Sequence, residues 1–351
     1  MVLPMFHQHL PLYTGSFFVA PIQLNSIIYV LMIITEMDGS DWMRDLPIDI
    51  RANRPLCQLV IPGTHDSFTY HLNKNLPVGP DTDKGARRLG NVFPCVKSII
   101  YNWSKCQNMD VEEQLNRGVR YLDIRLGILP QKYCNESLLE GEENLDKFRF
   151  IHALYGDSIK IPFEKLRNFL DAHPSEVVIL DIQHTYSFSQ EDHEFLALKI
   201  LKYFGPKLCP KTEAMHNLTL DYMKHKGYQI IVIYPKMSKS PIPGNQFLWP
   251  RESCRSPWAN TTKLSILEPF LKNGLEHRDN KNAFFVSQVI LTPTTNTVVS
   301  HLSSSLERSL AKTCDKFAFE WLSNHPSNLN IVIVDFVEKD NIIKAIIQNN
   351  K

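Results

Sequence analysis

The chain has 351 residues, of which 43% are hydrophobic and 21% are charged, a balance typical of a soluble globular protein with a large core. Its 38 Lys and Arg residues nearly balance its 37 Asp and Glu residues, which gives a formal net charge of +1. This near-neutrality provides no global electrostatic basis for binding nucleic acid, although a local basic surface is compatible with it. Nothing in the sequence calls for an obligate protein partner.

The first 40 residues differ from the rest of the chain. No Asp, Glu, Lys or Arg precedes Glu36, and residues 26–35 form a compact apolar segment. The segment lacks the basic start and the small cleavage-site residues of a signal peptide. Pro21 and Gln23 interrupt the roughly twenty apolar residues that a transmembrane helix needs. We interpret residues 1–40 as an extension outside the fold, either poorly ordered or in contact with a membrane, and residues 41–351 as one catalytic domain.

From Asp41 onward, short β-branched segments alternate with amphipathic helical segments. The candidate strands, in chain order, are Gln58–Ile61, Val119–Leu126, Phe148–His152, Val177–Gln183, Gln229–Tyr234, Ala283–Gln288 and Ile331–Phe336. Two of them, at 177–182 and 331–336, are continuous apolar segments, which are typical of strands buried on both faces in a parallel sheet.

Helical patterns separate these strands. The expected helices are Val111–Arg117, Pro162–Ala172, Gln190–Phe204, one or two helices within Val298–Trp321, and a closing helix at Lys339–Gln348. The segment Lys236–Thr262, rich in Pro, Ser and Trp, is expected to form a long loop. Alternation of strands and helices over the whole domain predicts an α/β fold, a TIM-like (β/α) barrel of parallel strands with its active site at their C-terminal rim.

The seven cysteines are spread along the chain and include no C-x-x-C pair, so neither a zinc site nor a thioredoxin-like motif is indicated. We expect buried free thiols in a reducing compartment, and therefore a cytoplasmic protein.

Polar side chains follow several of the predicted strands. His65 and Asp66 follow the first strand, Asp123 and Arg125 end the second, and His152 ends the third. Asp181, Gln183 and His184 end the fourth strand, and Asp335 lies in the last. In a parallel barrel these strand ends share one rim, where active sites are built.

These residue types suit phosphodiester cleavage by an internal hydroxyl. Two histidines can supply a base and an acid with pKa values near neutral pH. Two aspartates can each orient one imidazole, and one arginine can neutralise charge on a phosphoryl group.

Each residue also has a purely structural explanation. A histidine at a strand end is often only hydrogen-bonded, and an aspartate such as Asp335 can cap the next helix. Arg125 can simply pair with Asp123, and Trp249 and Trp258 can pack the long loop. The coincidence of several such residues on one predicted rim favours catalysis.

The sequence around His65 resembles the opening motif of the phosphatidylinositol-specific phospholipase C X-domain superfamily. The segments that carry the resemblance are Ile61-Pro62-Gly63-Thr64-His65-Asp66-Ser67, Gly118–Arg125, Phe150-Ile151-His152, and His173–Asp181. Asp41-Trp42-Met43, Leu248-Trp249-Pro250, Pro257–Thr262 and Ser287–Pro293 look like the small animal X-domain-containing proteins in particular. The resemblance extends from about Asp41 to the C-terminus.

The resemblance implies roles for individual residues. His65 would be the general base, with Asp335 as its partner, and His152 the general acid, with Asp66 beside it. Arg125 stands where calcium-dependent relatives carry an acidic metal ligand and bacterial enzymes carry an arginine.

The resemblance therefore implies the metal-independent branch, with no cofactor. A fixed guanidinium supplies a cation's electrostatic effect and repels a divalent ion from the same place. Asp123 and Gln183 would contact the substrate. Gln183 departs from the bacterial pattern, which has a lysine there, and so leaves the choice between plain and phosphorylated inositol lipids open.

The expected activity is a phospholipase C that cleaves phosphatidylinositol to diacylglycerol and an inositol cyclic phosphate. The expected partner is phosphatidylinositol or a related inositol lipid, at a membrane to which the protein binds peripherally. The alternative is a non-catalytic or weakly active phosphoinositide-binding protein, which Gln183 favours. A calcium-dependent phospholipase is disfavoured because the metal ligands are missing.

Overall fold

The computed structural model describes residues 39–134, 145–234, 242–279, 282–339 and 341–350. Of the expected extension 1–40, only residues 39 and 40 lie within these ranges. Both attach to the following domain, because Arg120 donates to the carbonyls of Gly39 and Ser40 at 3.0 and 2.7 Å. Among the described residues, no helix combines the length and apolarity needed to cross a membrane.

Eight parallel strands form a curled sheet in the order β7-β6-β5-β2-β1-β10-β9-β8. The strands of this path are β1 Ile61–Thr64, β2 Tyr121–Ile128, β5 Val178–Tyr186, β6 Ile230–Ile233, β7 Leu248–Trp249, β8 Cys254–Arg255, β9 Phe284–Gln288 and β10 Ile331–Val334. The first and last of them along the chain, β1 and β10, pair directly. No pairing joins β7 to β8 within the described residues, so the TIM-like barrel is open between these two short strands.

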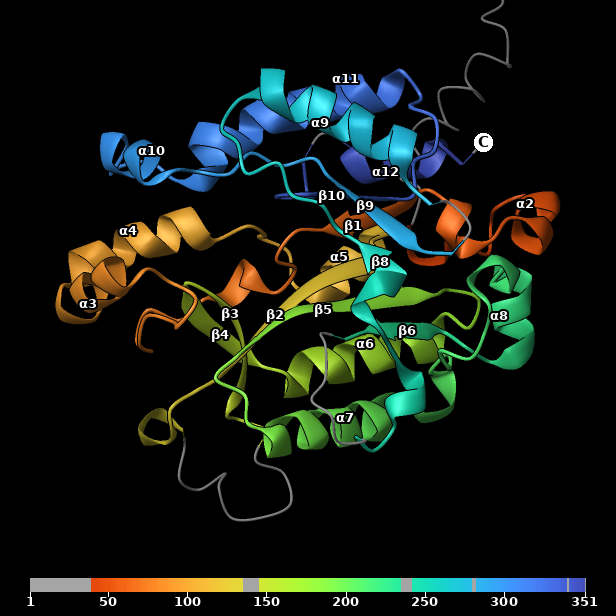
Figure 1. Cartoon of the computed structure of the whole chain (residues 1–351), viewed down its shortest axis with the longest axis horizontal. Helices are drawn as coiled ribbons and strands as arrows, with labels where there is room; N and C mark the ends of the chain where they lie inside the picture. Colours follow the sequence, from red (N-terminus) through yellow and green to blue (C-terminus); the bar gives the residue numbers. More distant parts are fainter. Residues whose placement is uncertain (1–38, 135–144, 235–241, 280–281, 340, 351) are drawn as a thin grey trace, which may run out of the picture. The chain divides into compact units, whose positions relative to one another are not determined.

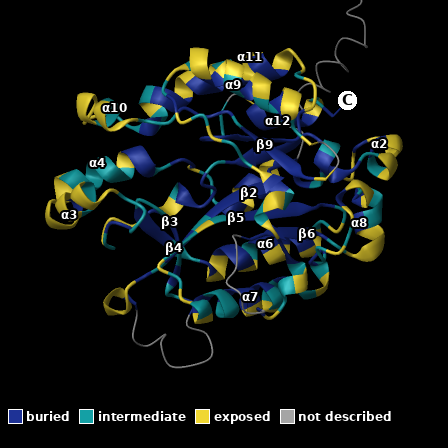
Figure 2. Cartoon of the chain, viewed as in Figure 1, coloured by how far each residue is buried: buried dark blue, intermediate teal, exposed yellow. Residues whose placement is uncertain are grey.

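Helices enclose the curled sheet. They are α2 Ile48–Asn53, α3 Lys84–Val92, α4 Pro94–Ser104, α5 Val111–Arg117, α6 Lys160–Ala172, α7 Gln190–Phe204, α8 Leu220–Lys226, α9 Leu264–His277, α10 Thr295–Ser300, α11 Lys312–Ser323 and α12 Ile342–Gln348. Figure 1 shows α9, α11 and α12 above the strands, α6 and α7 below them, and α8 beside them at the right. The strands are correspondingly buried, while α3 and α10 are largely exposed (Figure 2).

A hairpin departs from the expected barrel pattern. The strands β3 Phe148–His152 and β4 Leu154–Ser158 pair antiparallel with each other, and β3 pairs antiparallel with β2. His152 therefore ends a hairpin strand at the side of the barrel, rather than a parallel barrel strand as predicted. It still reaches the C-terminal rim, because β2 extends past the barrel to pair with β3 at Leu126–Ile128.

Several predicted boundaries need correction. The first strand begins at Ile61, and residues 56–58 form a 3-10 helix after Pro55. The long loop contains the two short strands β7 and β8, which its polar composition conceals. The expected helical region 298–321 consists of α10, a π-helical turn at Glu307–Ala311 and α11. Helices α5 and α7 have the predicted bounds, because Asp110 and Ser189 cap them and Gly118 and Gly205 follow them.

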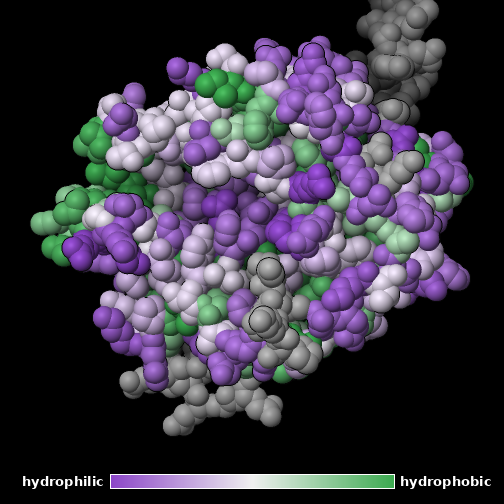
Figure 3. All heavy atoms as spheres, in the orientation of Figure 1, coloured by the Kyte–Doolittle hydropathy of each residue, from purple (hydrophilic) through white to green (hydrophobic). Residues whose placement is uncertain are grey.

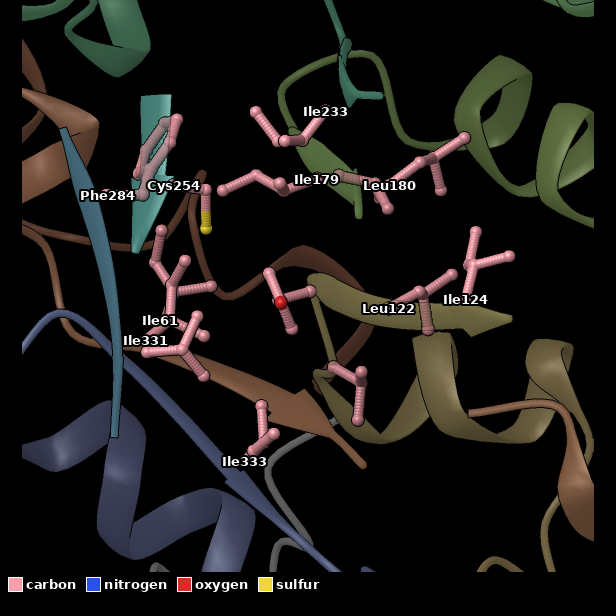
Figure 4. Close-up of a cluster of buried hydrophobic side chains, with 14 of the residues drawn as sticks. Ile61, Leu122, Ile124, Ile179, Leu180, Ile233, Cys254, Phe284, Ile331 and Ile333 are labelled. Carbon is pink, nitrogen blue, oxygen red and sulfur yellow. The ribbon is translucent and has the colours of Figure 1, made fainter. Parts of the chain in front are cut away.

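Apolar side chains from strands all round the sheet form the core. Figure 4 shows Ile61 of β1, Ile331 and Ile333 of β10, Phe284 of β9 and Ile179 of β5 in one cluster. The same alternation of side chains makes Asp123, the third residue of β2, and Asp181, the fourth residue of β5, the next inward positions, and these two residues pair in register. The apolar core therefore gives way to carboxylates at the C-terminal rim, where the surface has a hydrophilic hollow (Figure 3).

Candidate active site

A cavity of about 600 Å³ lies at the C-terminal rim of the barrel. Six of the seven residues predicted as site residues line it, namely His65, Asp123, Arg125, His152, Gln183 and Asp335. The seventh, Asp66, is buried and contacts the two histidines and Arg125. The structure thus brings all seven residues together from β2, β3, β5 and the segments that follow β1 and β10.

His65 and Asp335 form a hydrogen-bonded pair where the first strand, β1, lies beside the last, β10. The backbone N–H of His65 donates to Val334 at 3.1 Å, which continues the β1–β10 pairing beyond the strands. His65 Nδ1 lies 2.8 Å from Asp335 Oδ1, and Asp335 is buried. The expected proximity of the two residues is confirmed. An Nδ1–H that donates to Asp335 leaves Nε2 as the nitrogen that exchanges a proton.

Gln107 holds this pair in place. Its buried side-chain amide donates to the carbonyls of His65 and Val334, both at 3.0 Å, and its Oε1 accepts from Val337 at 3.3 Å. One side chain therefore connects the ends of β1 and β10. Sequence reasoning missed Gln107, because a glutamine in a loop carries no local signal of such a position.

Asp66 lies between the two histidines. Its Oδ2 is 3.3 Å from His65 Nε2 and 3.3 Å from His152 Nδ1, and the imidazole centroids are 6.1 Å apart. Its Oδ1 is 2.8 Å from Arg125 Nε, and its backbone N–H donates to Asp123 Oδ2 at 3.1 Å. One buried carboxylate thus faces both candidate acid–base groups and the arginine.

His152 is oriented by a backbone carbonyl. Its Nδ1 lies 2.8 Å from the carbonyl oxygen of Ser104, the last residue of α4, and 3.7 Å from Cys106 Sγ. An Nδ1–H that donates to Ser104 leaves Nε2 available to a substrate atom in the cavity. The partner that directly orients His152 is therefore a carbonyl, with Asp66 as its electrostatic neighbour.

The backbone is strained at three places in this site. Asp66, Ala153 and Phe336 have φ values of 41°, 56° and 49°, and they immediately follow His65, His152 and Asp335. Positive φ is unfavourable for residues with a side chain, at about 1–3 kcal/mol each, and persists where the surrounding structure enforces it. The strain therefore occurs directly after His65, His152 and Asp335, whereas β2, which supplies Arg125, has no such residue.

The electrostatics of the site favour a protonated His65. Burial opposes charge on its ring, but the carboxylates of Asp66 and Asp335 outweigh burial and raise the pKa of His65 to about 9. Burial also opposes ionisation of Asp66, yet the Arg125 guanidinium and the histidines lower its pKa. Burial, together with the neighbouring Asp66 carboxylate, raises the pKa of Asp123 despite the opposing guanidinium. The site therefore holds the Asp66 carboxylate charged next to a guanidinium.

A metal ion has one candidate position in the described part of the chain. His65, Asp66 and Cys106 offer ligand atoms that all lie within 4.8 Å of one another. Burial raises the pKa of the Cys106 thiol well above its ordinary value, so the thiolate that a metal needs is disfavoured. The Arg125 guanidinium, 2.8 Å from Asp66, already supplies positive charge there. These features fit a divalent cation poorly.

A second group of polar residues surrounds Gln183. Asp181 is fully buried and accepts hydrogen bonds from Tyr121 at 2.6 Å, from Gln183 at 3.3 Å and from both terminal nitrogens of Arg251. Arg251 comes from the long loop and was missed as a site residue. The one signal in the sequence is that Arg251 directly follows Leu248-Trp249-Pro250, a segment that carries the family resemblance.

The two tryptophans of the long loop have different surroundings. Trp249 is buried and donates to the carbonyl of Cys209 at 2.9 Å, so it packs the loop. Trp258 is half exposed, lines the cavity and donates to Thr292 at 2.8 Å. Sequence reasoning had left both alternatives open for both residues.

The chain is similar to curated proteins over most of its length. It is 34% identical to mouse PI-PLC X domain-containing protein 3 over 319 residues, which cover 90% of this chain and 94% of that protein. It is 35% identical to human PI-PLC X domain-containing protein 2 over 84% of this chain and 90% of that protein. For human PI-PLC X domain-containing protein 1 the identity is 31%, over 89% and 93% of the two chains. No family model matches the sequence.

Solved structures of bacterial enzymes share the fold. The phosphatidylinositol-specific phospholipase C of Listeria monocytogenes superposes with a TM-score of 0.59, at 19% identity, over 90% of this chain and 99% of that protein. A structure of the phosphatidylinositol-specific phospholipase C of S. aureus gives a TM-score of 0.59 at 17% identity, over 90% and 98% of the two chains. These matches support the TIM-like barrel.

Proposed function

The chain belongs to the family of PI-PLC X domain-containing proteins, and on that premise we propose that it is a metal-independent phospholipase C. It cleaves phosphatidylinositol or a related inositol lipid into diacylglycerol and an inositol cyclic phosphate. It acts as a cytoplasmic protein that binds membranes peripherally. Seven free cysteines support a reducing compartment, six of them buried and Cys95 exposed, contrary to the expectation of burial.

In the proposed reaction, His65 Nε2 takes the proton from the inositol 2-hydroxyl as its oxygen attacks phosphorus. The bond from phosphorus to the diacylglycerol oxygen breaks, and His152 Nε2 gives a proton to that oxygen. Arg125 stabilises the negative charge that builds on the phosphoryl oxygens. Water is not consumed in this step, and the product is the cyclic phosphate.

The remaining predicted residues have supporting roles in the proposal. Asp335 fixes the tautomer of His65, and Asp66 stabilises positive charge on either imidazole while orienting Arg125. Asp123 and Gln183 contact the inositol ring. Gln183 takes part in the Asp181 hydrogen-bond network and lies at the cavity surface, which supports a binding role for it.

One observation carries the proposal: the Asp66 carboxylate lies 3.3 Å from both histidines and 2.8 Å from Arg125. A structural histidine needs one hydrogen-bond partner. Here two imidazoles and a guanidinium share one buried carboxylate at the edge of a cavity, which is an arrangement suited to moving protons on opposite sides of a phosphoryl group.

Two observations favour the alternative of a binding protein with little turnover. The pKa of His65 is raised to about 9, so most of the imidazole is protonated at neutral pH and is a poor base until it loses that proton. Gln183 is uncharged, at a position where the family resemblance of the sequence implies a lysine in the bacterial enzymes. A headgroup phosphate would in turn be held well by a cationic His65 beside Arg125.

A turnover assay separates the two functions. The full chain is incubated with phosphatidylinositol vesicles in chelator, and diacylglycerol is quantified by mass spectrometry. The enzyme proposal expects diacylglycerol in proportion to protein and time, and its loss in His65→Ala. Headgroup binding by the wild-type chain, measured by calorimetry with a soluble inositol phosphate and accompanied by no diacylglycerol, would establish the binding protein instead.

A further inference from the structure

A loop before α3 holds the tip of the β3–β4 hairpin, the part of the fold that presents His152 to the cavity. The loop consists of residues 79–82. We propose that it fixes the candidate general acid in place, and that Asp81 is the positioning residue of His152. The inference rests on the proposed function, since it names a residue that acts through the general acid of that reaction.

The turn of this hairpin consists of one residue. His152 of β3 pairs with Leu154 of β4, so Ala153 alone connects the two strands. Ala153 has a φ of 56°, which is unfavourable for a residue with a side chain and persists where the surroundings enforce it. The direction in which His152 leaves β3 therefore depends on the contacts that enforce the conformation of Ala153.

The loop satisfies both backbone polar groups of Ala153. Asp81 Oδ2 accepts a hydrogen bond from the N–H of Ala153 at 2.6 Å. The N–H of Gly79 donates to the carbonyl of Ala153 at 2.7 Å, and the hydroxyl of Thr82 donates to the same carbonyl at 3.3 Å. These contacts come from the loop and not from the hairpin, so the loop is what enforces the turn.

The segment before the loop runs along the hairpin. Val78 forms an antiparallel bridge with Leu154, and the N–H of Asn73 donates to the carbonyl of Tyr155 at 2.8 Å. Asn91 of α3 holds the same segment, because its Oδ1 accepts from the N–H of Val78 at 2.8 Å. Figure 1 shows this segment, in orange, next to β4. The loop is thus attached to the hairpin and to α3.

Gly79 leaves room for the Asp81 carboxylate. A side chain at Gly79 would collide with Asp81 Oδ1 and with Ile151 of β3. Asp81 Oδ1 is buried and has no hydrogen-bond partner within the described part of the chain, although burial of such an oxygen is unfavourable. Stability alone therefore does not account for an aspartate here, whereas its contact with the residue after His152 does.

Displacement of Ala153 would misplace the proton donor. The ring of His152 is held by the carbonyl of Ser104 at 2.8 Å, and this contact requires the backbone of His152 to keep its place. A general acid contributes about 10²–10⁴-fold to turnover, and a misplacement of about 1 Å can cost about a hundredfold. The effect of Asp81 should therefore follow the leaving group, because only a leaving group that needs a proton depends on His152.

The experiment compares two water-soluble inositol phosphodiesters, one with an alkyl and one with a nitrophenyl leaving group. We expect Asp81→Ala to turn over the alkyl substrate about a hundredfold more slowly and the aryl substrate nearly as fast as the wild type. Asp81→Asn, whose side-chain oxygen can still accept from Ala153, should recover most of the loss. The matched control, Asn91→Ala, removes a different acceptor from the same segment and should keep the wild-type ratio of the two rates.

A second variant and a spectroscopic signal test the same idea without deleting the carboxylate or relying on turnover. Gly79→Ala displaces Asp81 and should change the ratio of rates as Asp81→Ala does. Nitrogen NMR of the His152 ring in alkaline buffer should show a protonated Nδ1 in the wild type, in Asp81→Asn and in Asn91→Ala. Asp81→Ala should show a mixture of tautomers, because the contact with Ser104 is weakened.

Each outcome decides the proposal. Equal losses on both substrates in Asp81→Ala would overturn it, and so would a raised KM for both substrates at an unchanged ratio, which would make Asp81 a substrate contact. Unchanged His152 signals in Asp81→Ala would also overturn it. No turnover of either substrate by the wild type would contradict the proposed function instead, and the His152 signals would then decide the role of Asp81.

Discussion

Asp335 Oδ1 lies 2.8 Å from His65 Nδ1, although 270 positions of sequence separate the two residues. Direct pairing of the last strand with the first, from Ile61↔Ile331 to Thr64↔Val334, brings them together. The pairing of β1 with β10 therefore also orients the candidate base, and each can be probed through the other.

Removing the charge of Asp335 should change the pH dependence of turnover. The Asp335 carboxylate helps to raise the pKa of His65 to about 9, and a base must be deprotonated to act. We expect kcat/KM of the wild type to rise with pH toward 9, and Asp335→Asn to shift this limb to lower pH while lowering the maximal rate. A pH profile on a soluble substrate measures both the position of the limb and the maximal rate. An unshifted limb would show that Asp335 does not set the pKa of the base.

The two histidines should respond differently to the leaving group. His65→Ala should lower turnover of any substrate by roughly two to four orders of magnitude, because every substrate needs the base. His152→Ala should do so for phosphatidylinositol and much less for an aryl phosphodiester, whose leaving group needs no proton. Equal losses on both substrates would remove His152 from the role of general acid.

Turnover should require Arg125, and a lysine at this position should not replace it. Arg125→Ala should reduce transition-state stabilisation by about 3 kcal/mol or more, and chelation should leave wild-type turnover unchanged. Arg125→Lys should restore little, since a single ammonium cannot lie beside Asp66 Oδ1 and His65 Nε2 at once, as Nε and Nη2 of the guanidinium do. An enzyme that stops in chelator and recovers with calcium would contradict the metal-independent assignment.

Gln107 should act as a positioning residue. Gln107→Leu leaves the carbonyl of His65 without its side-chain donor and the backbone N–H of Val337 without its acceptor, so it should lower the free energy of unfolding by about 1–3 kcal/mol per group. It should also lower kcat with little change in KM. Gln229→Leu is a matched control, because Gln229 is also buried and donates to the carbonyls of His173 and Glu176. The control variant should lose stability and keep its kcat. A similar loss of kcat in both variants would show that Gln107 has only a structural role.

Folding stability should depend on the protonation of His65. Its pKa in the folded chain, about 9, lies above the ordinary value of 6.5, so the folded state binds the proton more tightly. The resulting stabilisation is fully present below pH 6.5 and is lost as the pH rises through 9. Urea denaturation should show a decline over this range that is smaller in His65→Gln, and parallel declines in both proteins would contradict it.

The parallel pairing of the first strand with the last and the meeting of the site residues could be predicted from the sequence, because they depend on apolar patterning and on the geometry of parallel barrels. The β3–β4 hairpin could not, since a short apolar segment such as Phe148–His152 has the same composition in either strand direction. Gln107 and Arg251 were missed for another reason. Their positions are set by loops, whose course depends on tertiary contacts rather than on periodicity.

The most direct test of the central claim is the identity of the water-soluble product. Phosphatidylinositol is incubated with the full chain in excess chelator, and the released inositol phosphate is followed by phosphorus NMR with His65→Ala and Arg125→Ala alongside. We expect the wild type to form an inositol cyclic phosphate without added metal and both variants to form at least a hundredfold less, as the loss of a general base or of a phosphoryl-stabilising arginine predicts. Absence of the cyclic phosphate in the wild type, or its formation at equal rates by His65→Ala, would contradict the account.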